Sequence, residues 1–174
     1  MKRLLAILTL FVGLNVQAGI ISLNISDENV KLDDSVLVTL SGSGFDPFDS
    51  LSLDIEFDTS VFKFDALSVE GDLLNAAPLI FEVTEQMFGV ALTFVDFVPF
   101  AGGNFTLATF NLTANAVGST HFVLTNAIAS DFLSGPVQAD VVSRSASAAV
   151  VSAPATVSLF IIALLSLVIF RARN

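Results

Sequence analysis

Hydrophobic and polar residues alternate in short runs along most of this chain. The clearest run covers residues 51–58, where the apolar positions are Leu53, Ile55 and Phe57 and the acidic positions are Asp54, Glu56 and Asp58. A period of two sends successive side chains to opposite faces of a β-strand. The apolar positions should therefore face a core, and the three carboxylates should share the solvent-facing side.

Eight further runs have the length and composition of strands: 21–25, 36–40, 61–69, 79–84, 88–95, 105–114, 120–125 and 137–142. Glycine-rich breakers separate several of them, as at residues 41–44 and 101–104. Short strands with glycine turns and no long 3.6-residue pattern predict an all-β domain, an antiparallel β-sandwich or jelly roll of about nine strands. We place this domain at residues 19–142, and residues 143–150 are either a linker or a fading last strand.

The N-terminus has the pattern of a secretory signal peptide. Met1-Lys2-Arg3 is a basic start, residues 4–14 are apolar, and Val16-Gln17-Ala18 offers small residues at the cleavage site. Residues 1–18 are therefore predicted to be removed after Ala18. The alternative is a retained N-terminal anchor.

The C-terminus has the pattern of a membrane segment. Residues 157–170 are apolar except for two serines, and with the residues before them they approach the ~20 residues that span a bilayer. Pro154 stands where a helix can begin. Arg171 and Arg173 follow as a cytoplasmic stop. A transmembrane helix over residues 157–170 is predicted, and a buried core helix is the alternative.

Charge and composition limit what the middle of the chain can do. Between residues 19 and 150 there are three basic residues (Lys31, Lys63 and Arg144) against seventeen acidic ones, a net charge of −14. Such a charge repels nucleic acid, so no nucleic-acid partner is expected. The chain has no cysteine and hence no disulfide, and its core must use seventeen phenylalanines without any Trp or Tyr.

The tail resembles the PEP-CTERM sorting signal of Gram-negative bacteria. Val151, Pro154, Ala155 and Thr156 match the Val-Pro-Glu-Pro-Ala-Thr-like motif, while Ser152 and Ala153 replace its first Pro and its Glu. An apolar helix and an arginine-rich end follow in the same order, so residues 151–174 form a variant of this signal. The resemblance implies processing by an exosortase, a membrane transpeptidase. A sortase signal and a GPI signal are the alternatives.

Two stretches resemble cohesin domains. The first stretch comprises residues 53–64 and 69–74. In residues 53–64 a strand is followed by a turn similar to Asp-Pro-x-x, with Thr59 at the position where Pro is common. In residues 69–74 a glycine turn precedes a small apolar pair. The second stretch comprises residues 103–114, 118–120 and 124–127. The resemblance implies a nine-stranded jelly roll related to some carbohydrate-binding modules. It also implies a protein partner of the dockerin type, or a polysaccharide ligand.

Few residues are candidates for chemistry. Asp54, Glu56 and Asp58 should stand about 6.5–7 Å apart on one strand face. They are interpreted first as a solvated face, then as a cation contact for Ca²⁺, and only last as a glycosidase pair. No other cofactor or metal is predicted. His121, the single histidine, should point outward between inward-facing neighbours, and no catalytic arrangement can be built around it.

The best candidate for recognition is the segment 96–103, which we expect to be a loop. Phe97 and Phe100 lie there beside Pro99 and two glycines, and aromatic side chains in loops often mark binding surfaces. We assign them as contacts for a ligand or partner. The alternative is that both rings cover an open end of the sandwich.

These observations predict an exported, non-enzymatic protein. We expect a precursor anchored in the inner membrane and then a surface or extracellular protein with a structural or adhesive role in the extracellular polymer layer. The alternative is a carbohydrate-binding module or a cohesin-type protein-interaction domain. The lack of Trp and Tyr weighs against a sugar platform, and a glycosidase fragment rests on carboxylate spacing alone.

Overall fold

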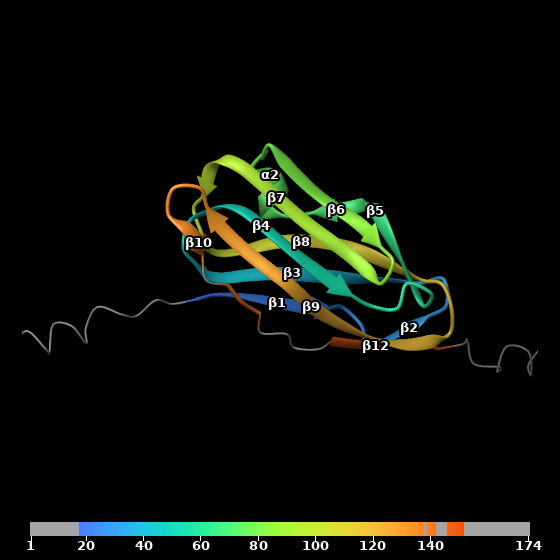
Figure 1. Cartoon of the computed structure of the whole chain (residues 1–174). Helices are drawn as coiled ribbons and strands as arrows, with labels where there is room; N and C mark the ends of the chain where they lie inside the picture. The colour runs from blue at the N-terminus through green and yellow to red at the C-terminus, as the bar shows by residue number, and fades with distance from the viewer. Residues whose placement is uncertain (1–17, 138, 142–145, 152–174) are drawn as a thin grey trace, which may run out of the picture.

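Two β-sheets pack face to face in the computed structural model, which describes residues 18–137, 139–141 and 146–151 (Figure 1). The first sheet has the order β11-β1-β3-β8-β5. Its strands are β1 (Gly19–Ile25), β3 (Ser35–Phe45), β5 (Phe62–Glu70), β8 (Gly103–Ala114) and β11 (Ala139–Val141). A short helical turn, α2 (Asp72–Asn75), follows β5.

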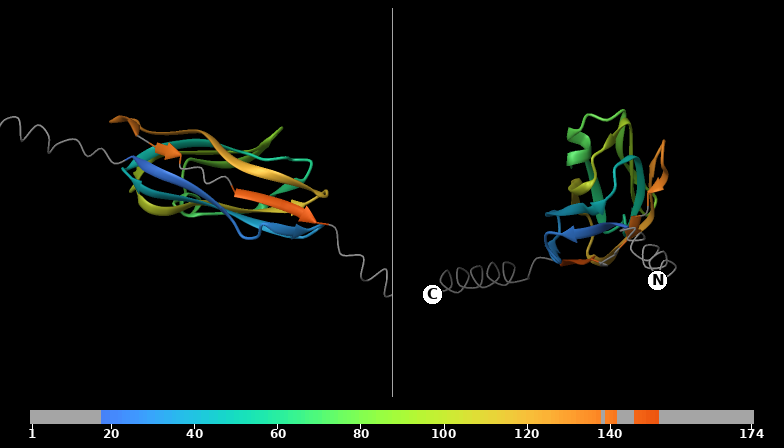
Figure 2. Two further views of the ribbon diagram at one scale, coloured as in Figure 1. Left: turned by 90° about the horizontal axis from the view of Figure 1, so that it is seen from below. Right: turned by 90° about the vertical axis from the view of Figure 1, so that its left-hand side faces the viewer.

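The second sheet has the order β2-β12-β9-β4-β7-β6, and β10 pairs with β9 beside this path. Its strands are β2 (Asn29–Lys31), β4 (Phe48–Glu56), β6 (Ile80–Gln86), β7 (Gly89–Phe100), β9 (Gly118–Asp131), β10 (Gly135–Val137) and β12 (Ala146–Val151). Most pairs are antiparallel, but β1 with β11 and β2 with β12 are parallel. The two views of Figure 2 show the layers from below and from one end.

Alternation along the central strand β4 places its side chains in two environments. Leu51, Leu53 and Ile55 are buried, whereas Ser52 and Glu56 are exposed on the other face. Phe57 is also buried, although β4 ends one residue before it. The predicted inward face of this run is therefore confirmed. The all-β sandwich predicted from the sequence is confirmed as well.

Phenylalanine rings fill the core where β4 begins. The Phe48 side chain is fully buried, and its ring centroid lies 5.5–5.7 Å from those of its four aromatic neighbours, Phe45, Phe94, Phe100 and Phe105. Most of these pairs are tilted or edge-on, the arrangements that aromatic rings prefer. A Phe ring has no polar atom, so this cluster needs no hydrogen-bond partner inside the core.

The strands are divided more finely than the sequence predicted. The described residues form twelve strands rather than nine, because β2, β10 and β11 contain three residues each and the run 137–142 splits between β10 and β11. Residues 146–151 form β12, which pairs with β9. Ala148 and Val150 of β12 are buried, so the sandwich extends beyond residue 142 to Val151.

Neither predicted membrane-associated segment can be placed. Residues 1–17 and 152–174, which include the signal-peptide run and the helix predicted over 157–170, lie outside the described residues. Within the described part of the chain, no helix has the length and apolar character needed to cross a bilayer.

We predict that Phe48→Ala lowers the free energy of unfolding by about 3–5 kcal/mol, because it opens a cavity among four rings. Phe97→Ala, at an exposed position, should change it by less than about 0.5 kcal/mol. Chemical denaturation followed by circular dichroism measures both. Equal losses for the two variants would contradict the assignment of one ring to the core and the other to the surface.

Candidate functional site

Exposed aromatic side chains belong to one of the two sheets and its turns. Within the described residues three phenylalanines are exposed: Phe88 at 69%, Phe97 at 77% and Phe132 at 65% of their surface. Phe88 is in the turn between β6 and β7, Phe97 is in β7, and Phe132 is in the turn between β9 and β10. All three therefore belong to the second sheet and its turns.

The outer face of the first sheet has a different character. Paired positions on β1, β3 and β8 carry small polar side chains, namely Ser22, Thr39, Ser41, Thr109, Asn111 and Thr113. The most exposed apolar residue in the strands of this sheet is Leu67 in β5, at 98%. The contrast between the two sheets makes the outer face of β9-β4-β7-β6 the candidate functional surface.

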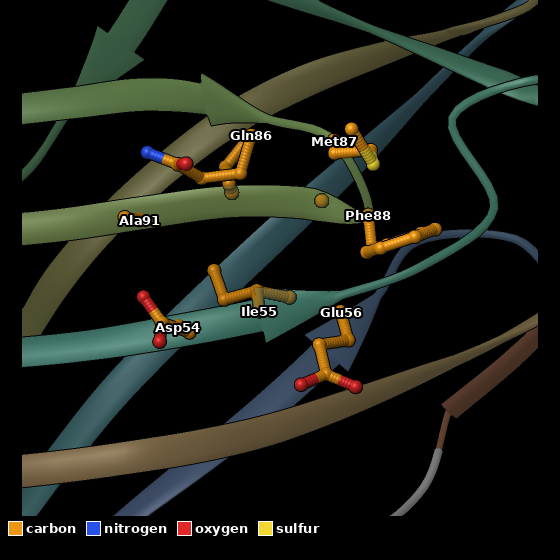
Figure 3. A pocket seen from close by; sticks show the side chains of 9 residues that line it. Asp54, Ile55, Glu56, Gln86, Met87, Phe88 and Ala91 are labelled. Atoms are coloured by element: carbon orange, nitrogen blue, oxygen red, sulfur yellow. The ribbon is translucent and has the colours of Figure 1, made fainter.

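This surface is hollowed beside β4. In the sheet register Asp54 pairs with Ala91, and Glu56 pairs with Gly89. These two β7 residues have little or no side chain, and a cavity of about 360 Å³ lies over them. Figure 3 shows Asp54 and Glu56 of β4 on one side of β7, Gln86 of β6 on the other, and Met87 with Phe88 at the turn. We call this hollow the β7 trough.

Gly89 is required by the close approach of β7 to β4. Its φ of 149° is unfavourable for other residues, and a Cβ atom there would collide with the carbonyl oxygen of Ile55. The Phe57 N–H donates to the Phe88 carbonyl over 2.9 Å and fixes the same corner. The glycine thus sets one end of the trough.

Neutral donors on β9 orient the two trough carboxylates. Asn126 Nδ2 donates to Asp54 Oδ2 over 2.7 Å, and Thr125 Oγ1 donates to Glu56 Oε1 over 3.2 Å. Asn126 has a positive φ of 53° at a bulge in β9, which brings its amide to Asp54. Each carboxylate keeps its second oxygen without a partner among the described residues.

Asp58 lies outside β4, contrary to the expectation of one strand carrying all three carboxylates, although it lines a hollow together with Glu56. The strand β4 ends at Glu56, and Asp58 begins a turn in which its carboxylate accepts bonds from the Ser60 side chain (2.6 Å) and the Ser60 N–H (2.9 Å). The Ser60 hydroxyl and then its N–H lower the pKa of Asp58. The residue therefore fixes a turn.

A second hollow of about 510 Å³ lies on the other side of the Met87–Phe88 turn. Its lining includes Glu56, Asp58 and His121, with Glu56, Met87 and Phe88 shared with the β7 trough. His121 is exposed, as predicted, while Phe122 and Leu124 beside it are buried. The turn is thus a projecting apolar feature between two shallow acidic hollows.

The structure separates Phe97 from Phe100 and corrects the expected loop. Residues 96–100 belong to β7, not to a loop. Phe100 packs against the core, 4.8 Å between ring centroids from Phe105, whereas Phe97 points to solvent. The alternative, that the ring covers an end of the sandwich, therefore holds for Phe100. Only Phe97 remains available to a partner.

Asp49, in β4, positions the turn that carries Phe132. Its side chain is 2% exposed, and its Oδ2 accepts the Phe132 N–H over 2.6 Å. Asp131 Oδ1 accepts the next two N–H groups, of Leu133 (2.8 Å) and Ser134 (3.4 Å), and the Leu133 bond lowers the pKa of Asp131. Asp49 Oδ1 is buried without a partner among the described residues.

Metal chemistry gains no support from the side-chain arrangement. Within residues 18–137, 139–141 and 146–151, no group of three or more His, Cys, Asp or Glu side chains is placed to hold a metal ion. Of the predicted sorting and membrane-stop residues, only Val151 is described. It ends β12 and pairs with Lys31 of β2. Pro154, Ala155, Thr156, Arg171 and Arg173 lie outside the described residues.

Phe88 and Phe132 were missed as candidate contacts. Met87-Phe88 is an apolar two-residue turn without the Asn or Gly that usually indicates a hairpin, so residues 88–95 were assigned to a strand. The available signal was the pair of alternating runs on either side of it.

Comparison with known proteins identifies the fold. No family model and no curated protein matches the chain. Among solved structures, CaCohA2 from Clostridium acetobutylicum is similar with a TM-score of 0.60 and 19% identity, covering 78% of this chain and 93% of that one. A non-cellulosomal cohesin from the archaeon Archaeoglobus fulgidus is similar with a TM-score of 0.61 and 14% identity, covering 78% of this chain and 92% of that one.

A third similar structure is the sixth cohesin of Acetivibrio cellulolyticus scaffoldin B, in complex with a mutant Cel5 dockerin. It gives a TM-score of 0.61 and 14% identity, covering 78% of this chain and all of that one. The fold is that of a cohesin. At such identities the likeness concerns the fold alone, and at that level the cohesin-like domain predicted from the sequence is confirmed.

Proposed function

We propose that this chain is a non-enzymatic protein-interaction module of the cohesin type, with the outer face of β9-β4-β7-β6 as its docking surface. The fold supports this proposal, since similar structures include cohesins in complex with dockerins. The surface supports it independently, because its hollows are shallow and its apolar residues project into solvent. A large protein partner fits such a surface better than an enclosed small molecule does.

The exposed aromatic residues carry the proposal. Phe88, Phe97 and Phe132 project from the second sheet and its turns, and Ile128 on β9 is 66% exposed between them. Exposed aromatic groups of this kind supply most of the energy in many protein interfaces. The outer face of the first sheet offers no exposed ring among its described residues.

We predict that replacing Phe88, Phe97 and Phe132 together by Ser weakens partner binding at least about 100-fold, because each ring is a candidate hot spot. To find the partner, the full chain in detergent micelles is used as bait for proteins in the exported fraction of its own organism. The captured protein is purified and titrated by calorimetry. Leu67→Ser, at the most exposed position of the first sheet, is the matched control and should bind within about twofold of the unchanged chain.

Two outcomes would contradict this function. One is equal affinity of the triple variant and the unchanged chain for the captured protein. The other is retention of the chain by its organism's isolated extracellular polysaccharide, with no saturable protein partner. That result would favour the carbohydrate-binding alternative.

We further propose that the module acts at the cell surface or in the extracellular polymer layer of a Gram-negative bacterium, in a structural or adhesive role. The N-terminal export pattern and the PEP-CTERM-like tail support this proposal. They also support an exosortase as the processing partner and the membrane as a transient anchor site.

Processing has a direct signature in the mass of the exported protein. We predict loss of residues 1–18 and a C-terminus near Thr156, measured by intact mass spectrometry. A secreted form that still ends at Asn174 would contradict the sorting proposal without affecting the interaction module.

A further inference from the structure

The four strands of the proposed docking surface carry charge of one sign. They contain seven acidic residues, Asp49, Asp54, Glu56, Glu82, Glu85, Asp96 and Asp131, and neither Lys nor Arg. The described lysines, Lys31 and Lys63, lie on β2 and β5. A partner that docks on this face therefore meets a field that attracts positive charge.

The β7 trough concentrates that charge in a space with a definite shape. The row Thr125–Asp54–Ala91–Thr84 crosses the sheet beside the row Val123–Glu56–Gly89–Gln86. Because the β7 members are Ala91 and Gly89, the surface is low between the β4 carboxylates and the β6 side chains. Figure 3 shows the Asp54 side chain over β4 and the Gln86 side chain beside β6, with β7 between them.

Two oxygen acceptors without a partner among the described residues lie at the trough. Asn126 occupies one oxygen of Asp54 and leaves Oδ1 without a partner in the described part of the chain. The Gln86 amide nitrogen donates to Thr84 Oγ1 over 3.3 Å, which orients the amide, and its Oε1 can accept. A carboxylate and an amide oxygen facing a common space match a side chain that only donates.

The apolar end of the trough restricts the ligand further. Met87 and Phe88, both exposed, line the same cavity as Asp54 and Gln86. A planar guanidinium can donate to the carboxylate and also stack on an aromatic ring, whereas an ammonium group is a compact, strongly hydrated charge. This combination fits arginine better than lysine. It also fits a protein side chain better than a metal ion, which the described residues do not surround.

We propose that the β7 trough receives an arginine side chain of the protein partner, held by Asp54 and Gln86 and flanked by Phe88. This proposal rests on the proposed function, since it supplies the chemistry of the partner at the same docking surface. Glu56, which leans toward β9, adds attraction without closing the trough.

The test uses a small probe, so that it does not depend on finding the partner. Full-length protein in micelles is titrated with N-acetyl-arginine methylamide and followed by NMR. The neutral isostere N-acetyl-citrulline methylamide is the control ligand. We expect saturable shifts at the amides of Asp54, Gly89 and Ala91 with the arginine probe, and none with the citrulline probe.

Matched variants separate the trough from overall charge. Asp54→Asn removes one charge while keeping an acceptor for Asn126, and should weaken the arginine probe about tenfold. Glu82→Gln removes one charge from the outer face of β6, one row away, and should change affinity less than about twofold. Equal losses in the two variants, or equal shifts with citrulline, would overturn the proposal.

The remaining outcomes are equally decisive. Millimolar Ca²⁺ is titrated in the same NMR experiment. If Ca²⁺ saturates the same amide shifts and displaces the arginine probe, the trough is a cation site and the proposal is overturned. If the captured protein binds through the phenylalanines but is indifferent to Asp54→Asn, the docking function stands and the arginine assignment fails. If the arginine probe binds but no protein partner exists, the trough stands and the docking function fails.

Discussion

The structure depends on one constraint: β4 must satisfy a packed core and a solvated surface with alternating residues of a single strand. It pairs with both β7 and β9, so it has no free edge. Its inward side chains Leu51, Leu53 and Ile55 reach the core, and its outward positions must then be polar or small. Any function on this sheet has to be built on those outward positions.

The same constraint explains why the surface is suited to docking. Because the interior is filled by apolar side chains and the Phe48 ring cluster, most polar groups lie on the outer faces and in the turns. Close packing of β7 on β4 requires Gly89, which leaves the outer face low beside Glu56. Phe88 lines this acidic trough and Phe97 projects farther along β7, a mixture of apolar anchors and charge that is typical of protein interfaces.

The sequence predicts the features that strict alternation controls. The inward face of β4, the outward His121 and the sandwich class all follow from a period of two. Parity within β7 also places Phe94 and Phe100 inward and Phe97 outward, but in the sequence Pro99 and the following glycines indicate a loop. Alternation continues for two residues beyond the end of β4, so the pattern extends the strand over Asp58, which begins a turn.

Other features have weak sequence signals for physical reasons. The strand β12 consists of Ala, Ser and Val, and such small residues give no clear period, so pairing with β9 and β2 decides its structure. The Met87–Phe88 turn is apolar and resembles strand. The trough depends on cross-strand register, which brings Asp54 opposite Ala91, and on the β9 bulge at Asn126. Neither can be read from one segment alone.

The central claim is that the outer face of β9-β4-β7-β6 is the surface covered by a partner in the cell. Photochemical carbene labelling of the chain in place on its own cells, compared with the purified full chain, measures this directly. The account predicts that labelling of Phe88, Phe97 and Phe132 falls in place while labelling of Leu67 is unchanged. Unchanged labelling of the three phenylalanines, or protection of Leu67 instead, would contradict it.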